Sequence, residues 1–463
     1  MMVDQNIFRA YDIRGIAMGA AATLTPDVAE LIGKAAGTYL LRKGFNQMVV
    51  GRDGRVTSPE LQKRFIGGAL SVGMNVTNIG LAVSPMLYFA TCVEGYDCGV
   101  NITASHNPKE YNGFKIVGDG AKSICGDELQ IIYKMIENED FADGNGIYTE
   151  QDVWPEYKSK LLSQVKIERP LKVVFDAANG VAGAFIKDLF DSAGVGGTYL
   201  FTEVDGDFPN HEANPEIVEN VQDIIAKVAE IGADLGVGYD GDGDRIGIVD
   251  ENGKFYSADL LLLLLSRDLL KRQPGAKIVF DTKCSRVLEN DIKARGGVPL
   301  RSATGHSFIE ARMHQEGALL GGEISGHMFF GENYYGFDDS FLATLKFLEI
   351  LSNADMPFSA LFADVPQVFN TPEIKLPCPD DRKFEIVREV TQWFLDNDYD
   401  CLTMDGVFVS LDDSTWGAVR CSNTSPNLTL RFEADTEEKL QGVRDLFRGV
   451  LAKYPELSIN GVL

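Results

Sequence analysis

Three aspartates alternate with glycines in one short run, Asp240, Asp242 and Asp244 with glycine at 241 and 243. Because glycine tolerates tight backbone turns, alternate carboxylates can converge on one point. Three anionic oxygens suit Mg²⁺, which prefers an octahedral oxygen shell and takes its remaining ligands from water or phosphate. The run therefore predicts a magnesium site.

A calcium-binding EF-hand loop is the alternative interpretation of this run, since Glu251 falls at the twelfth position counted from Asp240. Arg245 occupies the sixth position, where such a loop needs glycine. The flanking segments, 235–237 and 246–249, are apolar and typical of strands rather than helices. We therefore favour magnesium, with the Arg245 guanidinium balancing the carboxylates or gripping a phosphate.

Ser105 follows an apolar segment, within the polar run of residues 103–108. A serine hydroxyl is a poor nucleophile unless a base or a metal ion activates it. The chain has no G-x-S-x-G pattern at this serine, so an α/β-hydrolase elbow is not supported. A Ser-His-Asp triad stays open because His106, His306 and His327 exist, but nothing in their spacing favours it.

Two further polar segments offer groups that bind phosphate or hydroxyls. Residues 420–426 carry a guanidinium, hydroxyls and an amide between two strand-like segments, which fits either a phosphate-binding loop or a plain hairpin turn. In residues 323–327, the carboxylate of Glu323 is suited to accept hydrogen bonds from vicinal sugar hydroxyls. Residues 304–307 add hydroxyls and a histidine.

A faint internal repeat predicts how these segments are positioned. Apolar strands at 49–51, 173–175 and 278–280 each run into a polar turn and then a helical pattern. A second strand in each block is entered through a glycine, and it leads into the serine, aspartate or glutamate segment. We expect three related α/β domains with mixed, mainly parallel sheets, whose loops face one central cleft.

The last hundred residues follow a different pattern. A helix over about 381–395, strands near 406–409, 416–420 and 428–432, and a closing helix over about 436–452 predict an α+β domain with an antiparallel sheet. We place the four domains at 1–150, 151–253, 254–365 and 366–463. Within the first domain we expect Ser58 to be the N-cap of a helix that has proline at its first position.

Composition excludes several classes of partner. The 463 residues carry a net charge of −25, which disfavours nucleic acid and anionic membranes as partners. Seven scattered cysteines without a C-x-x-C pair, and an N-terminus unlike a signal peptide, favour a reducing compartment, the cytoplasm. The leucine run at 260–265 is too short to span a bilayer and predicts a buried helix.

The combined motifs resemble the α-D-phosphohexomutase family from end to end. They occur in order at residues 11–15, 103–108, 112–115, 240–245, 323–327 and 420–426. The resemblance implies four domains around a cleft and a Mg²⁺-dependent isomerase. Such an enzyme interconverts hexose 1-phosphate and hexose 6-phosphate, of mannose, glucose or both, through a phosphoserine. A hexose 1,6-bisphosphate, such as glucose 1,6-bisphosphate, serves as intermediate and activator.

The resemblance also implies a role for each matching residue. Ser105 is the phosphoserine and a metal ligand together with Asp240, Asp242 and Asp244. The other catalytic residues are Lys115 and His327, the candidates for proton transfer, with Arg245 and Arg14. Substrate binding falls to Tyr11, Lys283, His306, Glu323, Ser325, Arg420, Ser422, Asn423 and Thr424. Glu323 and Ser325 match residues that read the sugar O3 and O4, and the last four match a loop for the distal phosphate.

Two positions depart from the family pattern, and several alternatives stay open. Ile324 stands where close relatives often carry methionine, and Glu310 stands where we expect lysine. A phosphoglucosamine mutase usually has glutamine at position 324, and a mutase strict for glucose is disfavoured by residues 326–327. A sugar-phosphate binding protein without activity would be expected to lack Ser105 or an aspartate, and a phosphatase would not need the distal phosphate loop. Both a monomer and a small homo-oligomer fit.

Overall fold

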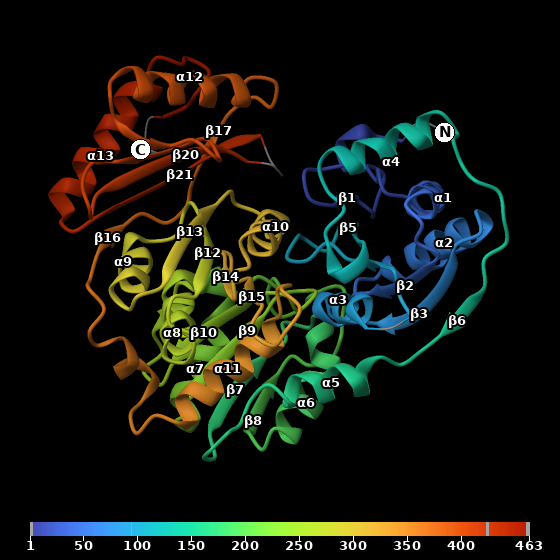
Figure 1. Cartoon of the computed structure of the whole chain (residues 1–463), viewed down its shortest axis with the longest axis horizontal. Coiled ribbons are helices and arrows are strands. Elements are labelled where there is room, and N and C mark those ends of the chain that lie inside the picture. Colours follow the sequence, from blue (N-terminus) through green and yellow to red (C-terminus); the bar gives the residue numbers. More distant parts are fainter. Residues whose placement is uncertain (1–2, 94, 423–425, 460–463) are drawn as a thin grey trace.

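The computed structural model describes residues 3–93, 95–422 and 426–459 of the chain. Four sheets follow one another along the sequence, and each has helices packed on it (Figure 1). The first domain, blue in the figure, lies on one side, and the fourth, orange to red, lies above the third. Short 3-10 helices occur at Gln5–Ile7, Asp119–Ala121, Val181–Ala184, Val218–Val221 and Phe358–Phe362.

The first sheet has the strand order β1-β5-β4-β2-β3-β6. Its strands are β1 (Ile13–Ile16), β2 (Gln47–Arg52), β3 (Asn75–Leu81), β4 (Cys98–Ile102), β5 (Tyr111–Val117) and β6 (Tyr148–Glu150). Its helices are α1 (Pro26–Arg42), α2 (Ser58–Ser71), α3 (Ser84–Cys92) and α4 (Asp127–Glu137).

The second sheet has the order β11-β10-β9-β7-β8, and the third has the order β13-β12-β14-β15. The second domain comprises α5 (Trp154–Leu162), β7 (Lys172–Asp176), α6 (Ile186–Ser192), β8 (Gly196–Leu200), α7 (Gln222–Ile231), β9 (Leu235–Tyr239), β10 (Ile246–Asp250) and β11 (Phe255–Tyr256). The third comprises α8 (Ala258–Arg272), β12 (Lys277–Asp281), α9 (Arg286–Ala294), β13 (Val298–Ser302), α10 (His306–Glu316), β14 (Leu320–Gly322), β15 (Met328–Phe330) and α11 (Ser340–Ser352).

The fourth sheet is antiparallel, with the order β16-β21-β20-β19-β18 and with β17 also paired to β21. Its elements are β16 (Phe369–Asn370), β17 (Ile374–Pro377), α12 (Lys383–Asp396), β18 (Asp400–Leu402), β19 (Val407–Ser410), β20 (Trp416–Cys421), β21 (Asn427–Ala434) and α13 (Glu437–Leu451). The α+β module predicted from the sequence is confirmed.

One topology recurs in the first three sheets. The orders β3-β2-β4-β5, β8-β7-β9-β10 and β13-β12-β14-β15 are equivalent, and only the last strand of each set is antiparallel to its neighbour. The sheets are therefore mixed and mainly parallel, as predicted. The equivalent strands β4, β9 and β14 each run into one of the chemistry-bearing loops. Topological equivalence places those loops at the same edge of each sheet.

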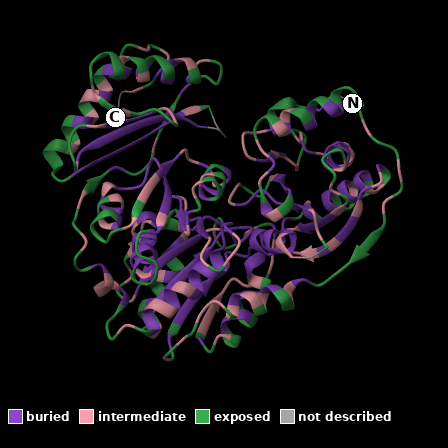
Figure 2. Ribbon diagram, viewed as in Figure 1, coloured by how far each residue is buried: buried purple, intermediate pink, exposed green. Residues whose placement is uncertain are grey.

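Buried residues, purple in Figure 2, follow the strands of the sheets. The apolar cores that they form do not coincide one to one with the sheets. One continuous apolar core joins the second domain, the third domain and α3 of the first. Separate cores lie inside the first and fourth domains. Helix α11 links the second and third domains, and its Thr344 hydroxyl lies 2.9 Å from the hydroxyl of Tyr239 at the end of β9. The loops after β9 and β14 are therefore held in one packed unit.

The start of α2 differs from the prediction. The N-cap is Thr57, Ser58 is already the first helical residue, and no side chain caps the helix. The Ser58 hydroxyl turns inward and donates to Asp53 Oδ1 at 2.5 Å. A buried carboxylate must find donors, and this need overrides the usual preference of serine for the cap.

Among the described residues, no helix combines the length and the apolar character needed to cross a bilayer.

Candidate active site

Ser105 lies at the turn that follows β4, with its side chain directed at the aspartate loop of the second domain. Its hydroxyl donates to Asp240 Oδ2 at 2.7 Å and lies 3.2 Å from His106 Nδ1. Its backbone has a φ of 50°, a left-handed conformation that is uncommon outside glycine, and its N–H donates to Thr103 Oγ1 at 2.9 Å. The hydroxyl is buried, so this loop presents it to the carboxylates rather than to solvent.

The two glycines of the aspartate loop, residues 240–245, are required for different structural reasons. Gly243 has a φ of 68°, which only glycine adopts freely. Gly241 instead allows close approach, because a Cβ added there would lie 2.4 Å from the Ser105 carbonyl oxygen. The loop is closed by Asp240 Oδ1, which accepts from the N–H groups of Asp244 at 3.1 Å and Arg245 at 3.2 Å.

The three aspartates form a group that fits a metal ion. Ligand oxygens of Asp240, Asp242 and Asp244 all lie within 4.8 Å of one another, and all three residues are buried. Within the part of the chain that the structure describes, Asp242 Oδ1 and Asp244 Oδ1 are buried without a hydrogen-bond partner. Buried carboxylate oxygens are costly when unpaired, and a divalent cation would satisfy both.

Lys115, on β5, brings a positive charge to the same carboxylates. Its ammonium donates to Asp242 Oδ2 at 2.7 Å and also contacts Asp244 Oδ2. Burial acts to lower the pKa of Lys115, but attraction to Asp242 and then Asp244 leaves it well above its usual value. The lysine is therefore a fixed cation in this cluster. Ser84, at the start of α3, adds a hydrogen bond to Asp242 Oδ2 at 2.7 Å.

The aspartates do not titrate alike. Burial, followed by repulsion from Asp244 and Asp242, raises the pKa of Asp240 well above its usual value. Burial and Asp244 also act to raise the pKa of Asp242, but Lys115 and the hydrogen bonds from Lys115 and Ser84 leave it lowered. Lys115 therefore sets Asp242 and Asp244, which it contacts directly, apart from Asp240.

Arg245 and His327 join the second domain to the third. Arg245 Nε donates to His327 Nε2 at 2.9 Å, and the two backbones form an isolated antiparallel bridge. Because arginine only donates, His327 Nε2 accepts and a neutral ring carries its proton on Nδ1. That nitrogen lies 2.5 Å from Asp338 Oδ2 and 3.7 Å from Asp244 Oδ1. Burial lowers the pKa of His327 to about 4, although Asp244 acts to raise it.

Residues 323–327, the predicted sugar loop, lie against a turn of their own domain. Glu323 Oε1 accepts from the Gly305 N–H at 2.5 Å, and the Ser325 hydroxyl donates to Glu323 Oε2 at 3.3 Å. From the first domain, the Tyr11 hydroxyl donates to the Thr304 carbonyl at 2.7 Å. The Tyr11 ring also lies 6.0 Å from that of His306. These predicted residues therefore lie close to one another, and their role in substrate binding stays a prediction.

Other predicted cations are engaged by carboxylates. Arg420 Nε donates to Asp405 Oδ2 at 2.7 Å, and Lys283 Nζ donates to Glu373 Oε2 at 2.6 Å. Arg14 pairs with its neighbour Asp12 and donates to Asn107 Oδ1 at 2.6 Å, which ties it to the serine loop.

In the fourth-domain loop, the Ser422 carbonyl accepts from Lys383 Nζ at 2.6 Å. Asn423 and Thr424 lie outside the described residues.

A cavity of about 560 Å³ lies where the second, third and fourth domains meet. Its walls include Glu216, Lys283, Ile324, Gly326 and Glu373. It therefore adjoins the sugar loop. Glu216 Oε2 also lies 3.6 Å from Arg245 Nη1, which links this cavity to the metal loop.

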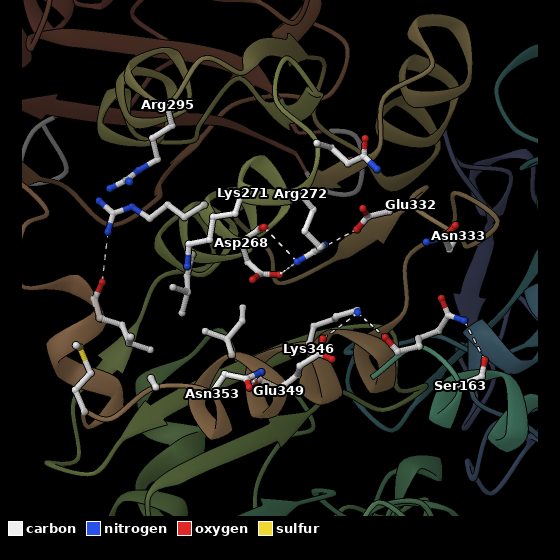
Figure 3. A pocket seen from close by; sticks show the side chains of 18 residues that line it. Ser163, Asp268, Lys271, Arg272, Arg295, Glu332, Asn333, Lys346, Glu349 and Asn353 are labelled. Atoms are coloured by element: carbon white, nitrogen blue, oxygen red, sulfur yellow. Dashed lines mark hydrogen bonds and ion pairs between the residues drawn. The ribbon is translucent and has the colours of Figure 1, made fainter. Parts of the chain in front are cut away.

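A larger cavity, of about 1030 Å³, lies between α8 and α11 (Figure 3). None of its described lining residues is a predicted site residue. Most of its cations already face carboxylates, as Arg272 does toward Asp268 and Glu332 and Lys346 toward Glu349. Size alone does not identify the site, because the smaller cavity is lined by the predicted site residue Lys283 and the larger one by none of the predicted site residues that the structure describes.

Several residues at the site had no signal in the sequence. Ser84 and Asp338 are ordinary helix-start and loop residues until packing brings them against Asp242 and His327. From the sequence, Asp405 and Glu373 look like ordinary acidic surface residues. In the structure they accept hydrogen bonds from Arg420 and Lys283. The one available hint was the acidic pair at 338–339 before an apolar helix, and it is equally typical of a cap.

Four family models match consecutive parts of the chain. Phosphoglucomutase/phosphomannomutase α/β/α domains I, II and III match residues 5–143, 155–253 and 257–369, and the C-terminal domain matches residues 373–450. The chain belongs to the phosphoglucomutase/phosphomannomutase family. It is thus a mutase, an enzyme of the isomerase class. The domain boundaries near 150, 253 and 365 stay a prediction.

Individual relatives agree over nearly the whole length. The chain is 43% identical to phosphomannomutase/phosphoglucomutase of Pseudomonas aeruginosa over 96% of this chain and 95% of that one. It is 40% identical to phosphoglucomutase of Neisseria meningitidis serogroup A over 98% of both. A solved structure of a family protein from Burkholderia thailandensis superimposes with a TM-score of 0.91 at 39% identity, covering 98% of this chain and 99% of that one. The resemblance inferred from the motifs is confirmed.

Proposed function

We propose that this enzyme interconverts the 1-phosphate and 6-phosphate of mannose, glucose or both. The observation that carries the proposal is the hydrogen bond from the Ser105 hydroxyl to Asp240, inside a buried group that also holds Lys115, Asp242 and Asp244. A hydroxyl, three carboxylates and a fixed cation are the parts that phosphoryl transfer needs. The names of the relatives, which include both phosphomannomutase and phosphoglucomutase, support both sugars.

In this proposal Ser105 carries the phosphoryl group at rest. The bond from phosphorus to Ser105 Oγ breaks as a bond forms to the free sugar hydroxyl, and the sugar becomes a hexose 1,6-bisphosphate. The opposite phosphate then returns to Ser105 and leaves the isomeric monophosphate. Lys115 and His327 are the candidates for moving the hydroxyl proton, since both lie against Asp244. Burial of the loop would keep water from the phosphoserine.

Asp240, Asp242 and Asp244, with an oxygen of Ser105 or its phosphate, would hold Mg²⁺. When bound, the ion would neutralise charge on the transferring phosphoryl group. Arg245 and Arg14 would contribute further positive charge, Arg245 next to the aspartate loop and Arg14 through its contact with Asn107 of the serine loop.

The remaining predicted residues would hold the sugar and its second phosphate. Glu323 and Ser325 would accept and donate at the O3 and O4 hydroxyls, with Tyr11, His306 and Lys283 beside them. The distal phosphate would bind to Arg420, Ser422, Asn423 and Thr424. A protein of the same fold, Aspergillus fumigatus N-acetylphosphoglucosamine mutase, has been solved with glucose 1,6-bisphosphate, the kind of intermediate proposed here.

We further propose that the enzyme works in the cytoplasm as a monomer or small homo-oligomer, without nucleic acid or membrane partners. The net charge of −25 supports the last point, because the chain repels polyanions except where cations are gathered locally.

A coupled assay on glucose 1-phosphate and mannose 1-phosphate tests the proposal, with Mg²⁺ and a trace of hexose 1,6-bisphosphate. We expect Ser105→Ala to abolish both activities and to remove the phosphorylated fraction from the intact-mass spectrum, with thermal stability retained. Equal activity in wild type and Ser105→Ala would overturn the phosphoserine mechanism.

A further inference from the structure

Arg55 lies in the turn after β2 and is buried, with 1% of its surface exposed. Its two terminal nitrogens donate four hydrogen bonds, and every acceptor is a backbone carbonyl of one segment, residues 105–111. Nη2 donates to the carbonyls of Ser105 at 2.7 Å and Asn107 at 2.6 Å. Nη1 donates to those of Pro108 at 2.8 Å and Tyr111 at 3.1 Å. All four terminal hydrogens of the guanidinium are therefore used on the serine loop.

The arginine is itself held from three sides. Asp53 Oδ2 lies 3.2 Å from Arg55 Nε, and the other Asp53 oxygen accepts from the Arg55 N–H at 3.0 Å and from Ser58. The ring of Phe208, in the second domain, covers the guanidinium at 5.3 Å. Gly206 approaches so closely that an added Cβ would lie 2.7 Å from the Arg55 Cα. The guanidinium of Arg55 is therefore held in place by contacts outside the serine loop.

The hydrogen bonds from Arg55 act on Ser105, a residue with an uncommon backbone conformation. Ser105 adopts a left-handed φ of 50°, which a non-glycine residue keeps only where its surroundings impose it. Its carbonyl accepts a hydrogen bond from Arg55, and Gly241 approaches the same oxygen closely. These two contacts restrain the carbonyl, while the side chain of Ser105 donates to Asp240 at 2.7 Å.

We propose that Arg55 is a positioning residue for phosphoryl transfer, which holds the Ser105 loop so that Oγ stays aligned with the metal carboxylates. The inference rests on the proposed function of Ser105. Arg55 acts through the backbone of the loop, and its hydrogen bonds reach neither the sugar loop nor Arg420. Its loss should therefore lower kcat and leave the KM for the hexose phosphate nearly unchanged.

The test is Arg55→Lys in the full-length enzyme. Lysine keeps the charge but offers three donors at one point instead of a planar fork, so it cannot reach four carbonyls. We expect kcat to fall about 10- to 100-fold, since misplacing a reacting atom by about 1 Å has effects of that size. We expect KM to stay within about 3-fold. Hydrogen–deuterium exchange, followed by mass spectrometry, should be faster in the peptide covering residues 103–111.

Arg267→Lys is the matched control. Arg267 is also a buried, ion-paired arginine, with carboxylate contacts at 2.6 Å to Asp291 and 2.8 Å to Asp364, but it lines the cavity between α8 and α11. We expect this variant to lose thermal stability while kcat and the exchange of residues 103–111 stay as in wild type. An equal loss of kcat in both variants would mean general loosening and would overturn the proposal.

A second variant decides the question if Arg55→Lys does not fold. Phe208→Leu keeps the arginine fork and removes only the ring that covers it. We expect a smaller loss of kcat, again with faster exchange confined to residues 103–111. Unchanged kcat and unchanged exchange in the folded variant would overturn the proposal. Retained activity in Ser105→Ala would instead refute the proposed function, and the exchange data would still report whether Arg55 holds the loop.

Discussion

The two ends of the candidate site are built differently. At the phosphoryl end, Ser105, Lys115 and the three aspartates contact one another directly across two domains, and all are buried. In the part of the site proposed to hold the sugar and its second phosphate, Lys283 and Arg420 instead face Glu373 and Asp405, carboxylates that lie outside residues 240–245 and 323–327. Around Ser105 the polar groups bind one another, except that Asp242 Oδ1 and Asp244 Oδ1 have no hydrogen-bond partner. The cations Arg420 and Lys283 pair with carboxylates that a bound phosphate would replace.

The packing follows this division only in part, because Ser105 and Lys115 follow or lie on strands of the first domain, which has a core of its own. The loops after β9 and β14 grow out of one apolar core that also includes α3, whose first residue, Ser84, supports Asp242. The fourth domain has a core of its own, between its sheet and the helices α12 and α13. We therefore expect the loops after β9 and β14 to stay fixed relative to each other, while the fourth domain, with its separate core, adjusts when a ligand binds. In the mechanism proposed above such an adjustment would be useful, because one phosphate reacts while the other is only held.

The largest effect on kcat should come from a substitution in the aspartate loop. Asp242→Asn removes one metal ligand and the carboxylate that Lys115 and Ser84 both contact. We expect kcat to fall about 100- to 1,000-fold, because an electrostatic group at the reacting phosphoryl is lost. Titration calorimetry with Mg²⁺ should show weakened binding as well. Asp250→Asn changes another buried aspartate of the same domain and should keep its activity. Wild-type kcat in Asp242→Asn would contradict the metal assignment.

A smaller effect, on KM rather than kcat, is expected from substitutions in the fourth domain. Arg420→Gln removes a charge-assisted contact to the distal phosphate, and we expect KM to rise about 10- to 100-fold. Asp405→Asn should act in the opposite direction, since it releases Arg420 from its carboxylate before the phosphate arrives. Steady-state kinetics on both variants measures this. The same change of KM in both would mean that Asp405 supports the arginine instead of competing for it.

The contact between the first and third domains should show a pH-dependent stability. Glu310, on α10, is buried against Ser123 of the first domain, whose hydroxyl donates to it at 2.8 Å. Burial raises the pKa of Glu310 to about 8, above the ordinary value near 4.5. The folded protein therefore keeps a proton that the unfolded chain releases, so this contribution to stability is lost as pH rises from about 4.5 to 8.

Glu310→Gln removes the titratable group, and with it the loss of stability between about pH 4.5 and pH 8. Compared with wild type, we expect it to be more stable by on the order of a few kcal/mol at pH 8, with the difference shrinking towards pH 4.5. Denaturant unfolding at pH 5 and pH 8 measures it. A constant difference at both pH values would show that Glu310 does not titrate in this range.

The smallest expected signal is a change of shape. If the fourth domain adjusts on its own core, X-ray scattering should report a slight compaction when a hexose bisphosphate analogue binds. Arg420→Gln should show less of it at the same analogue concentration. Superimposable wild-type curves with and without the analogue would mean that the fourth domain is as rigid as the rest of the molecule.

Much of the fold was predictable because the first three domains repeat one pattern. A strand entered through glycine, followed by a polar loop, recurs at β4, β9 and β14, and the loops meet at the centre as expected. The start of α2 was predicted wrongly, because serine is a common cap and only the buried carboxylate of Asp53 turns Ser58 inward. Local preference decides a cap unless a tertiary partner competes for the same side chain.

By itself the sequence determined which groups are available: Ser105 after a buried strand, three alternating aspartates, and a loop with Arg420. These depend on local order along the chain, which periodicity and spacing record. Only the tertiary structure decided that Lys115 lies between two aspartates, that Arg55 grips the Ser105 loop, and that Asp405 competes for Arg420. The last two contacts join segments that are 50 and 15 residues apart, and the lysine contacts cross from one domain to the next. Such distances are set by strand register and domain packing, not by any local pattern.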